Sequence, residues 1–344
     1  MYDNGNNRTN VHSYSWSIPL CWECALARTG MMYLVTELRV TELRVTPDMR
    51  TNHLLSFRCS PKCPLTFTTI KSDSYTLQFN AMGRTVLITG CSEGGMGAAL
   101  AKEFQQQGDR VFATARNVSK MASLKAMGIE TLILDVTSED SIQACISQVS
   151  SVTGGSLDIL VNNAGKGLCM PAIDLSIQEA KEIFDLNFWA ILRMSQVCLP
   201  LLQQAARAHG HALLVNQTSV SSVLGAPFWS AYNTSKAAAA MLIQNMRLEL
   251  APFGIKVIDL KTGGEIEKFS TGDMNSAGQE PGVWAKNVVS DLKKHNPSNI
   301  IWRGKSSTQI WLASHLPTTT LDSTMKKVAS LDVLEKRIHG KTLQ

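Results

Sequence analysis

The sequence predicts an α/β fold with a doubly wound parallel sheet, and two observations support this prediction. From Gly83 onward, short apolar runs rich in β-branched residues alternate with segments that have helical spacing. A glycine-rich turn, Gly90–Gly97, separates the first of these runs from the first helical segment, as in folds that bind phosphate groups at a helix N-terminus. We therefore expect a sheet of parallel strands with helices on both faces.

Residues 1–82 do not follow this alternation. They are rich in Asn, Ser and Thr and contain an immediate duplication, Thr36–Val40 and Thr41–Val45. The valines and threonines of the repeat allow a strand, but two copies are too few for a solenoid. We expect an irregular, poorly ordered N-terminal extension, and the alternative is an artefact of gene prediction.

Six apolar runs are expected to form the strands. They are Thr85–Thr89, Arg110–Thr114, Thr131–Leu134, Leu157–Val161, Ala212–Asn216 and Ile255–Leu260. Helical segments are expected between them, at Ala98–Phe104, Ser138–Ser150, Ile177–Leu202 and Tyr232–Leu250. This alternation predicts one main domain over residues 83–316, followed by a C-terminal tail helix within residues 317–344.

The residue that ends the second strand indicates which dinucleotide is bound. A carboxylate at this point hydrogen-bonds the adenosine ribose of NAD, but the strand here runs Ala113-Thr-Ala-Arg116 and offers a guanidinium instead. A guanidinium suits the 2′-phosphate of NADP(H). We therefore expect NADPH/NADP+ as the cofactor, with Arg116 at its 2′-phosphate; the alternative for Arg116 is a solvated loop cation.

Tyr232 and Lys236 stand four residues apart at the start of a helix, so one turn places the phenol and the ammonium on the same face. A cation beside a phenol favours the phenolate, and we expect Tyr232 to exchange a proton nearer to neutral pH than its ordinary pKa of about 10 allows. Ser219, upstream, offers a hydroxyl that can polarise a carbonyl. A tyrosine and a lysine at this spacing are also typical of a solvated pair, so their role depends on the surrounding fold.

The composition is that of a globular protein, with 44% hydrophobic and 18% charged residues and a formal net charge of +5 over 344 residues. The sequence contains no basic run with interleaved aromatic residues, so we expect no nucleic-acid partner. Neither a secretory leader nor an apolar run of about 18 residues is apparent, which favours a cytoplasmic location.

Cysteine usage indicates a reducing compartment and no metal. Four of the eight cysteines are scattered singly through the predicted domain. Cys21 and Cys24, together with Cys59 and Cys63, could be imagined as a zinc site, but their spacing fits no compact zinc motif.

Several independent motifs occur in order around this predicted fold, and from Gly83 to about Gly264 the chain resembles the short-chain dehydrogenase/reductase family, which implies a Rossmann-type sheet. The motifs are Thr89-Gly90…Gly95-Met-Gly97, Asp135, Asn162-Asn163-Ala164-Gly165, Asn187, Ser219 and Tyr232-Asn-Thr-Ser-Lys236. The glycine turn, Val111–Arg116, Thr131–Ser138 and Ile301–Lys305 further resemble the NADPH-dependent 1-acyldihydroxyacetone-phosphate reductase branch.

The resemblance implies a role for each motif residue. Tyr232 would be the general acid/base at a carbonyl oxygen, Lys236 would lower its pKa and hydrogen-bond the nicotinamide ribose, and Ser219 would hold the substrate oxygen. Asn187 would support a water-linked proton relay, with helix capping or kinking as the alternative. The remaining cofactor contacts would be Gly90, Ser92, Gly95 and Gly97 at the diphosphate, Asp135 at the adenine, Asn162 on the adenosine side of the cleft, and Thr262 after the sixth strand. A structural tie between strands is the alternative for Asn162.

The chain departs from the family after the sixth strand. Thr262 replaces a proline, and Glu267 falls where a threonine or serine is expected. Members of the family carry a substrate-covering loop at this point. Here the corresponding segment, residues 264–287, is short and rich in Gly, Ser and Glu. We expect a shortened substrate loop that weakens substrate binding more than chemistry.

The predicted activity is the NADPH-dependent reduction of a small-molecule ketone to a secondary alcohol. The resemblance suggests a substrate like acyl-dihydroxyacetone-phosphate, and hence lipid metabolism. The alternatives are a tailoring ketoreductase of secondary metabolism and a catalytically impaired NADP-binding protein.

The C-terminal part combines apolar and basic segments. Ile300–Lys305 is expected to form a final strand and Ile310–Leu316 a short apolar helix, with Lys326, Lys327, Lys336 and Arg337 behind it. This pattern allows a peripheral contact with membranes of the endoplasmic reticulum or lipid droplets. The alternative is a helix packed on its own core or on a partner subunit, and by analogy of fold we expect a homo-oligomer.

Overall fold

The computed structural model describes residues 40–47, 53–59, 83–264 and 280–340. The chain divides into two compact units, Met1–Met82 and Gly83–Gln344. In the first unit, β1 (Val40–Pro47) and β2 (His53–Cys59) form an antiparallel pair, and β1 contains the second copy of the repeat. The rest of the expected irregular extension lies outside the described residues, as does most of the expected shortened loop at 264–287, including Glu267.

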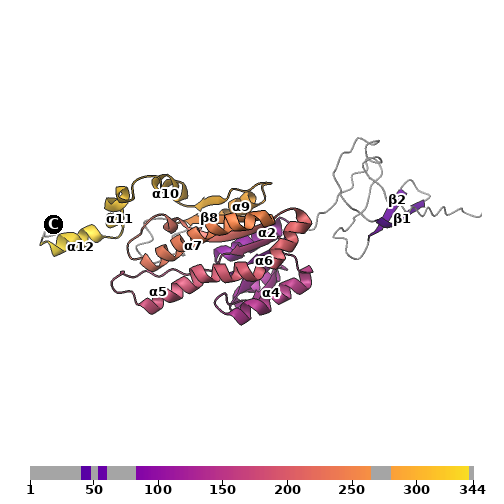
Figure 1. The fold of residues 1–344 in the computed structure, drawn as a ribbon, viewed down its shortest axis with the longest axis horizontal. Coiled ribbons are helices and arrows are strands. Elements are labelled where there is room, and N and C mark those ends of the chain that lie inside the picture. Colours follow the sequence, from indigo (N-terminus) through magenta and orange to yellow (C-terminus); the bar gives the residue numbers. More distant parts are fainter. Residues whose placement is uncertain (1–39, 48–52, 60–82, 265–279, 341–344) are drawn as a thin grey trace, which may run out of the picture. The chain divides into compact units, whose positions relative to one another are not determined.

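The second unit is built on a sheet of seven strands in the order β5-β4-β3-β6-β7-β8-β9, and every neighbouring pair is parallel (Figure 1). The strands are β3 (Thr85–Ile88), β4 (Arg110–Ala115), β5 (Glu130–Ile133), β6 (Ile159–Asn162), β7 (Ala212–Ser219), β8 (Ile255–Gly263) and β9 (Ile300–Gly304). The predicted fold class is therefore confirmed. Strands β7 and β8 run longer toward their carboxyl ends than the apolar runs predict, because polar residues there remain in the ladder.

Helices cover both faces of the sheet, because its strands are apolar on both faces. One hydrophobic core joins the sheet to α2 (Met96–Gln106), η1 (Val118–Met121), α3 (Ala122–Ala126) and α9 (Pro281–Leu292). The other core joins it to α4 (Glu139–Thr153), α6 (Ala190–His209) and α7 (Ser230–Leu250) (Figure 1). Side chains of a strand point alternately to the two faces of the sheet. In β3, Val86 and Ile88 accordingly belong to the first core and Leu87 to the second.

The helix predicted at 177–202 has a π-helical turn at its centre. It comprises α5 (Ile177–Phe184), the π-helix η2 (Asp185–Trp189) and α6, and Figure 1 shows α5 running on into α6. A π-turn places one additional residue in the helix and is often found at functional sites. The turn contains Asn187, whose side chain is fully buried.

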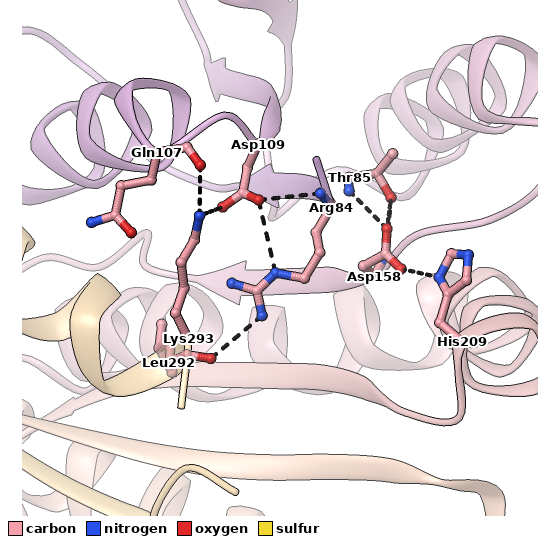
Figure 2. A network of polar contacts seen from close by, with 8 residues as sticks. All are labelled: Arg84, Thr85, Gln107, Asp109, Asp158, His209, Leu292 and Lys293. Carbon is pink, nitrogen blue, oxygen red and sulfur yellow. Dashed lines mark hydrogen bonds and ion pairs between the residues drawn. The ribbon is translucent and has the colours of Figure 1, made fainter. Parts of the chain in front are cut away.

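Polar side chains fasten the amino ends of the central strands (Figure 2). A carboxylate oxygen of Asp158 accepts hydrogen bonds from the backbone N–H and the hydroxyl of Thr85, both at 2.7 Å, and its other oxygen lies 2.6 Å from Nδ1 of His209. Beside it, Asp109 contacts the backbone N–H of Arg84 at 3.1 Å and Nζ of Lys293 at 3.0 Å. These bonds therefore lie at the amino ends of the strands, opposite the carboxyl ends.

After β9, the chain continues through α10 (Ser307–Ala313), η5 (Thr318–Leu321), α11 (Asp322–Val328) and α12 (Leu331–Ile338). The expected tail helix is thus divided in two at Ala329–Ser330. Within the described residues, no helix is long and apolar enough to cross a membrane, and no group of three metal-binding side chains gathers. Cys21, Cys24 and Cys63 lie outside those residues. The peripheral membrane contact and the homo-oligomer remain predictions.

Candidate active site

A cavity of about 1020 Å³ lies at the carboxyl ends of the central strands. It is lined by the glycine turn after β3, the ends of β4 and β5, the loop after β6, helix α5 with its π-turn, the end of β7, and the start of α7. Because the carboxyl ends of parallel strands meet at one edge, the turn, Arg116 and the pair Tyr232 and Lys236 reach the same cavity from distant parts of the chain.

The glycine turn packs so closely against the loop after β6 that side chains are excluded. Gly90 has φ +75, and a Cβ at this position would lie 2.9 Å from Cα of Ala164. A Cβ at Gly97 would lie 2.5 Å from both Nδ2 of Asn163 and the carbonyl oxygen of Gly90. Gly90, Ser92 and Gly95 line the cavity, whereas Gly97 is buried behind them in the first turn of α2.

The turn leads into a helix end that can bind an anion. Gly95 precedes α2 and provides no side-chain cap, so the first backbone N–H groups of α2 remain available beside the cavity. Free N–H groups at a helix N-terminus, together with the helix dipole, favour a phosphate. Three of the four predicted diphosphate contacts therefore line a surface suited to that group, and the fourth supports it.

Arg116 and Asp135 line the same end of the cavity, as the sequence predicts. Arg116 follows β4 and is exposed, while the Asp135 carboxylate accepts hydrogen bonds from the backbone N–H and the hydroxyl of Thr137 at 2.9 and 2.7 Å. Partial burial acts to raise the pKa of Asp135, but the bonds from Thr137 and the charge of Arg116 outweigh it and hold that pKa below its usual value.

At the other end of the cavity, Tyr232 and Lys236 lie on one face of α7, where Nζ of Lys236 is 5.9 Å from the centre of the Tyr232 ring. Nζ also donates a hydrogen bond to the backbone carbonyl oxygen of Gln217 at 2.9 Å. Ser219, the last residue of β7, is hydrogen-bonded to the side chain of Tyr232. Ser219 is itself buried, and the cavity is lined by its neighbours Gln217 and Thr218.

Burial dominates the pKa values of this pair. It raises the pKa of Tyr232 above its ordinary value, although the hydrogen bond with Ser219 acts in the opposite direction. The expected displacement toward neutral pH is therefore wrong. Burial also lowers the pKa of Lys236 from 10.5 to about 8, and the negative charge of Asp259 partly opposes this. The low dielectric of the site penalises both charged forms more than their proximity favours them.

Asn187 lies behind the same pair. Its Nδ2 donates hydrogen bonds to the carbonyl oxygen of Lys166 at 2.9 Å and to Oγ of Ser235 at 3.1 Å, and its Oδ1 accepts one from the N–H of Lys166 at 2.9 Å. A Cβ on Gly165 would lie 3.2 Å from Oδ1 of Asn187 and 3.3 Å from Nζ of Lys236. The π-turn therefore holds Asn187 against the loop after β6, close to Lys236.

Two predicted cofactor residues occupy other positions. Asn162 is buried in the sheet, where its Nδ2 donates to Oδ1 of Asn216 at 2.8 Å; the next residue, Asn163, lines the cavity. Side chains alternate along a strand, so two consecutive asparagines point in different directions. Asn162 therefore links two strands, whereas Asn163 lines the cavity. Thr262 stands opposite Ser219 in the β7–β8 ladder, and its hydroxyl is buried with no hydrogen-bond partner among the described residues.

A polar cluster in β7 and β8 lies beside the cavity and was not predicted from the sequence. The hydroxyl of Thr218 donates to Oδ1 of Asp259, whose Oδ2 lies 2.8 Å from Nζ of Lys261. Nζ of Lys261 donates to Oγ of Ser222 at 2.7 Å and lies 5.6 Å above the Trp302 ring. Charged residues inside the otherwise apolar run of β8 are the signal that could have revealed this cluster.

Comparison with known proteins decides which family this site belongs to. A sequence profile for the short chain dehydrogenase family matches residues 84–270. The chain belongs to this family. It is therefore an oxidoreductase of the short-chain dehydrogenase class, as predicted.

Relatives of this family match most of the chain. A short-chain dehydrogenase/reductase of Pestalotiopsis microspora is 43% identical over 284 residues, covering 74% of this chain and 97% of that relative. The NADPH-dependent 1-acyldihydroxyacetone phosphate reductase of Schizosaccharomyces pombe is 45% identical over 195 residues, covering 56% of this chain and 64% of that relative. The crystal structure of a short-chain dehydrogenase from Streptomyces avermitilis matches with a TM-score of 0.60 and 25% identity, covering 76% of this chain and 100% of that structure.

Proposed function

We propose that this protein is an NADPH-dependent oxidoreductase that reduces a ketone to a secondary alcohol, with Tyr232 as the proton donor. The observation that carries the proposal is that Tyr232 and Lys236 line the same cavity as the glycine turn and Arg116. A proton donor and a dinucleotide site in one cavity suffice for carbonyl reduction.

The residues around the cavity fit a dinucleotide along its length. The glycine turn and the uncapped N-terminus of α2 would hold the diphosphate, and Asp135 would lie at the adenosine. Arg116 would bind the 2′-phosphate that distinguishes NADPH from NADH. The Schizosaccharomyces pombe relative is an NADPH-dependent reductase, which supports the same cofactor.

When bound, NADPH would supply a hydride for the carbonyl carbon. Tyr232 then gives its phenolic proton to the carbonyl oxygen, so that the ketone gains one hydride and one proton and becomes an alcohol. The raised pKa of Tyr232 keeps the phenol protonated at neutral pH and ready for this transfer. The hydrogen bond with Ser219 orients the phenol, and Lys236 beside the ring stabilises the phenolate that is left. Asn187 holds the loop that faces Lys236.

The substrate is proposed at the level of a ketone. An acyl-dihydroxyacetone-phosphate-like lipid is favoured by the relative of Schizosaccharomyces pombe, but the match spans 64% of that protein. Ketones of secondary metabolism are the second class to test. Residues 265–279, which follow β8 next to the site, lie outside the described residues.

The decisive experiment follows NADPH absorbance with a panel of ketones that includes an acyl-dihydroxyacetone phosphate. We expect Tyr232→Phe to retain NADPH binding and to lose about 10²- to 10⁴-fold in kcat. Tight NADPH binding without ketone-dependent oxidation by the wild-type protein would instead identify a cofactor-binding protein without turnover. Equal turnover by both proteins would exclude Tyr232 as the proton donor.

A further inference from the structure

Gln217 has a buried side-chain amide with an unused acceptor. The residue lies in β7, is 6% exposed and lines the cavity. Its neighbours on the strand have partners: Asn216 accepts a hydrogen bond from Asn162, and Thr218 donates one to Asp259. Oε1 of Gln217, in contrast, is buried with no hydrogen-bond partner in the described part of the chain.

The amide nitrogen of Gln217 is also weakly engaged. The contact recorded for Nε2 is with the thioether sulfur of Met96 at 3.6 Å, and a thioether is a weak acceptor. A buried amide that lacks a good partner destabilises the folded chain, whereas an apolar side chain in this strand would not. Because the side chain lines a cavity, a polar group of a bound ligand can provide the missing bonds.

The position of Gln217 identifies the part of the ligand that it meets. Its side chain contacts Met96, the first residue of α2 after the glycine turn. Its own carbonyl oxygen accepts the hydrogen bond from Lys236. The side chain therefore stands between the diphosphate end of the proposed dinucleotide site and the proton donor. The nicotinamide ring must occupy this interval if its hydride is to reach a carbonyl beside Tyr232.

We propose that the side-chain amide of Gln217 binds the carboxamide of the nicotinamide ring. Two carboxamides are complementary, since each carries an N–H donor and a carbonyl acceptor. The bond would hold the ring in one orientation next to Tyr232 and would occupy Oε1. This inference depends on the proposed function in one respect, that a nicotinamide dinucleotide enters the cavity.

The test compares NADP+ with its 3-acetylpyridine analogue, in which a methyl group replaces the amide nitrogen. Dissociation constants are measured by calorimetry, so that the readout is independent of turnover. We expect the wild-type protein to bind NADP+ about tenfold more tightly than the analogue, and Gln217→Leu to bring this ratio close to one. The control, Arg116→Ala, should weaken both ligands and leave their ratio unchanged.

Thermal unfolding without a ligand distinguishes recognition from a structural role. Gln217→Leu and the straight-chain variant Gln217→Met remove an unpaired buried amide, so their melting temperatures should equal or exceed that of the wild type. Gln217→Met also replaces Gln217→Leu in the binding experiment if the branched side chain prevents folding. A lowered melting temperature with an unchanged affinity ratio would overturn the inference and indicate a structural amide.

The possible failures can be told apart. If the wild-type protein binds NADP+ but the affinity ratio is the same in Gln217→Leu, the inference on Gln217 is wrong and the proposed function stands. If the wild-type protein binds neither ligand, the proposed function is wrong and the inference on Gln217 is wrong with it.

Discussion

The carboxylate of Asp259 lies 2.8 Å from Nζ of Lys261, two residues later on β8, and both side chains are almost fully buried. The same carboxylate accepts a hydrogen bond from the hydroxyl of Thr218 in the cavity wall, and its charge acts on Lys236. A buried ion pair thus lies directly behind the residues proposed to move the proton. Its negative member opposes the effect of burial on the pKa of Lys236.

Asp259→Asn should shift the pH dependence of catalysis. Removing the negative charge lowers the pKa of Lys236 further below about 8, so Lys236 loses its proton at a lower pH. We expect the alkaline limb of the kcat profile to move down by about one pH unit. The matched control is Asp291→Asn, because Asp291 is a buried carboxylate on α9 that pairs with Lys294 and with Arg303 of β9 and does not line the cavity. An unmoved alkaline limb in Asp259→Asn would contradict this coupling.

Asp259→Asn also leaves Lys261 buried without its ion-pair partner, which costs about 3–5 kcal/mol of unfolding free energy. The double variant Asp259→Asn/Lys261→Met should recover most of this loss in urea unfolding, because no unpaired charge remains. The pH profile is therefore recorded at a temperature where circular dichroism shows the single variant to be folded.

Lys236 should make the stability of the fold depend on pH. Its pKa is about 8 in the folded chain and near 10.5 when exposed, so the unfolded state binds more protons between these values. Stability contributed by Lys236 is lowest below pH 8 and rises as the pH increases toward 10.5. Relative to Lys236→Met, we expect the wild type to gain about 2 kcal/mol in unfolding free energy between pH 7.5 and pH 9.5. An equal difference in unfolding free energy between the wild type and Lys236→Met at both pH values would show that Lys236 is not desolvated. The control is Lys286→Met, at an exposed site on α9.

Arg116→Ala should reduce the preference for NADPH over NADH. Loss of a charge-assisted bond to the 2′-phosphate is worth about 1.5–3 kcal/mol, or about 10- to 100-fold in the ratio of the two dissociation constants. Fluorescence titration with both cofactors measures this ratio. Arg207→Ala, at an exposed position in the last turn of α6, should leave it unchanged. If Arg116→Ala also leaves the ratio unchanged, Arg116 is a solvated loop cation.

Gly97→Ala should disrupt the proposed diphosphate site without altering the contacts of Tyr232, the proposed proton donor. The added methyl group would lie 2.5 Å from Nδ2 of Asn163 and from the carbonyl oxygen of Gly90, so the turn has to move. We expect NADPH affinity to fall by at least about tenfold, equivalent to about 1.4 kcal/mol. Gly225→Ala is the matched control, because among the described residues no atom outside its own chain neighbours lies within 4 Å of the added methyl. Wild-type affinity in Gly97→Ala would mean that the turn does not hold the diphosphate.

The sequence was sufficient to predict the strands and the assembly of the site. Apolar runs bounded by turns predicted six of the seven strands, β3 to β8, and Ile300–Lys305 was predicted as the last one. The parallel arrangement then required the glycine turn, Arg116 and the pair Tyr232 and Lys236 to meet at one edge. This part was predictable because it depends on periodicity and on the geometry of parallel sheets.

Features that depend on side-chain packing could not be predicted. Whether Asn162 or Asn163 reaches the cavity is decided by the exact end of β6, which apolar patterning locates only approximately. The raised pKa of Tyr232 results from burial by tertiary contacts, which outweighs the neighbouring cation apparent in the sequence. The pairing of Asp259 with Lys261 is local in sequence, but its position behind Lys236 arises from the pairing of β7 with β8.

The π-turn at Asp185–Trp189 divides one long helix into two parts whose sequences are under different structural constraints. Before the turn, α5 lines the cavity with Gln178, Lys181 and Glu182. Substitutions there change the surface that meets a ligand. Beyond it, α6 contributes to the hydrophobic core, so its inner face must keep its volume. A family with this arrangement can diversify its ligands on one half of a helix while the other half preserves the fold.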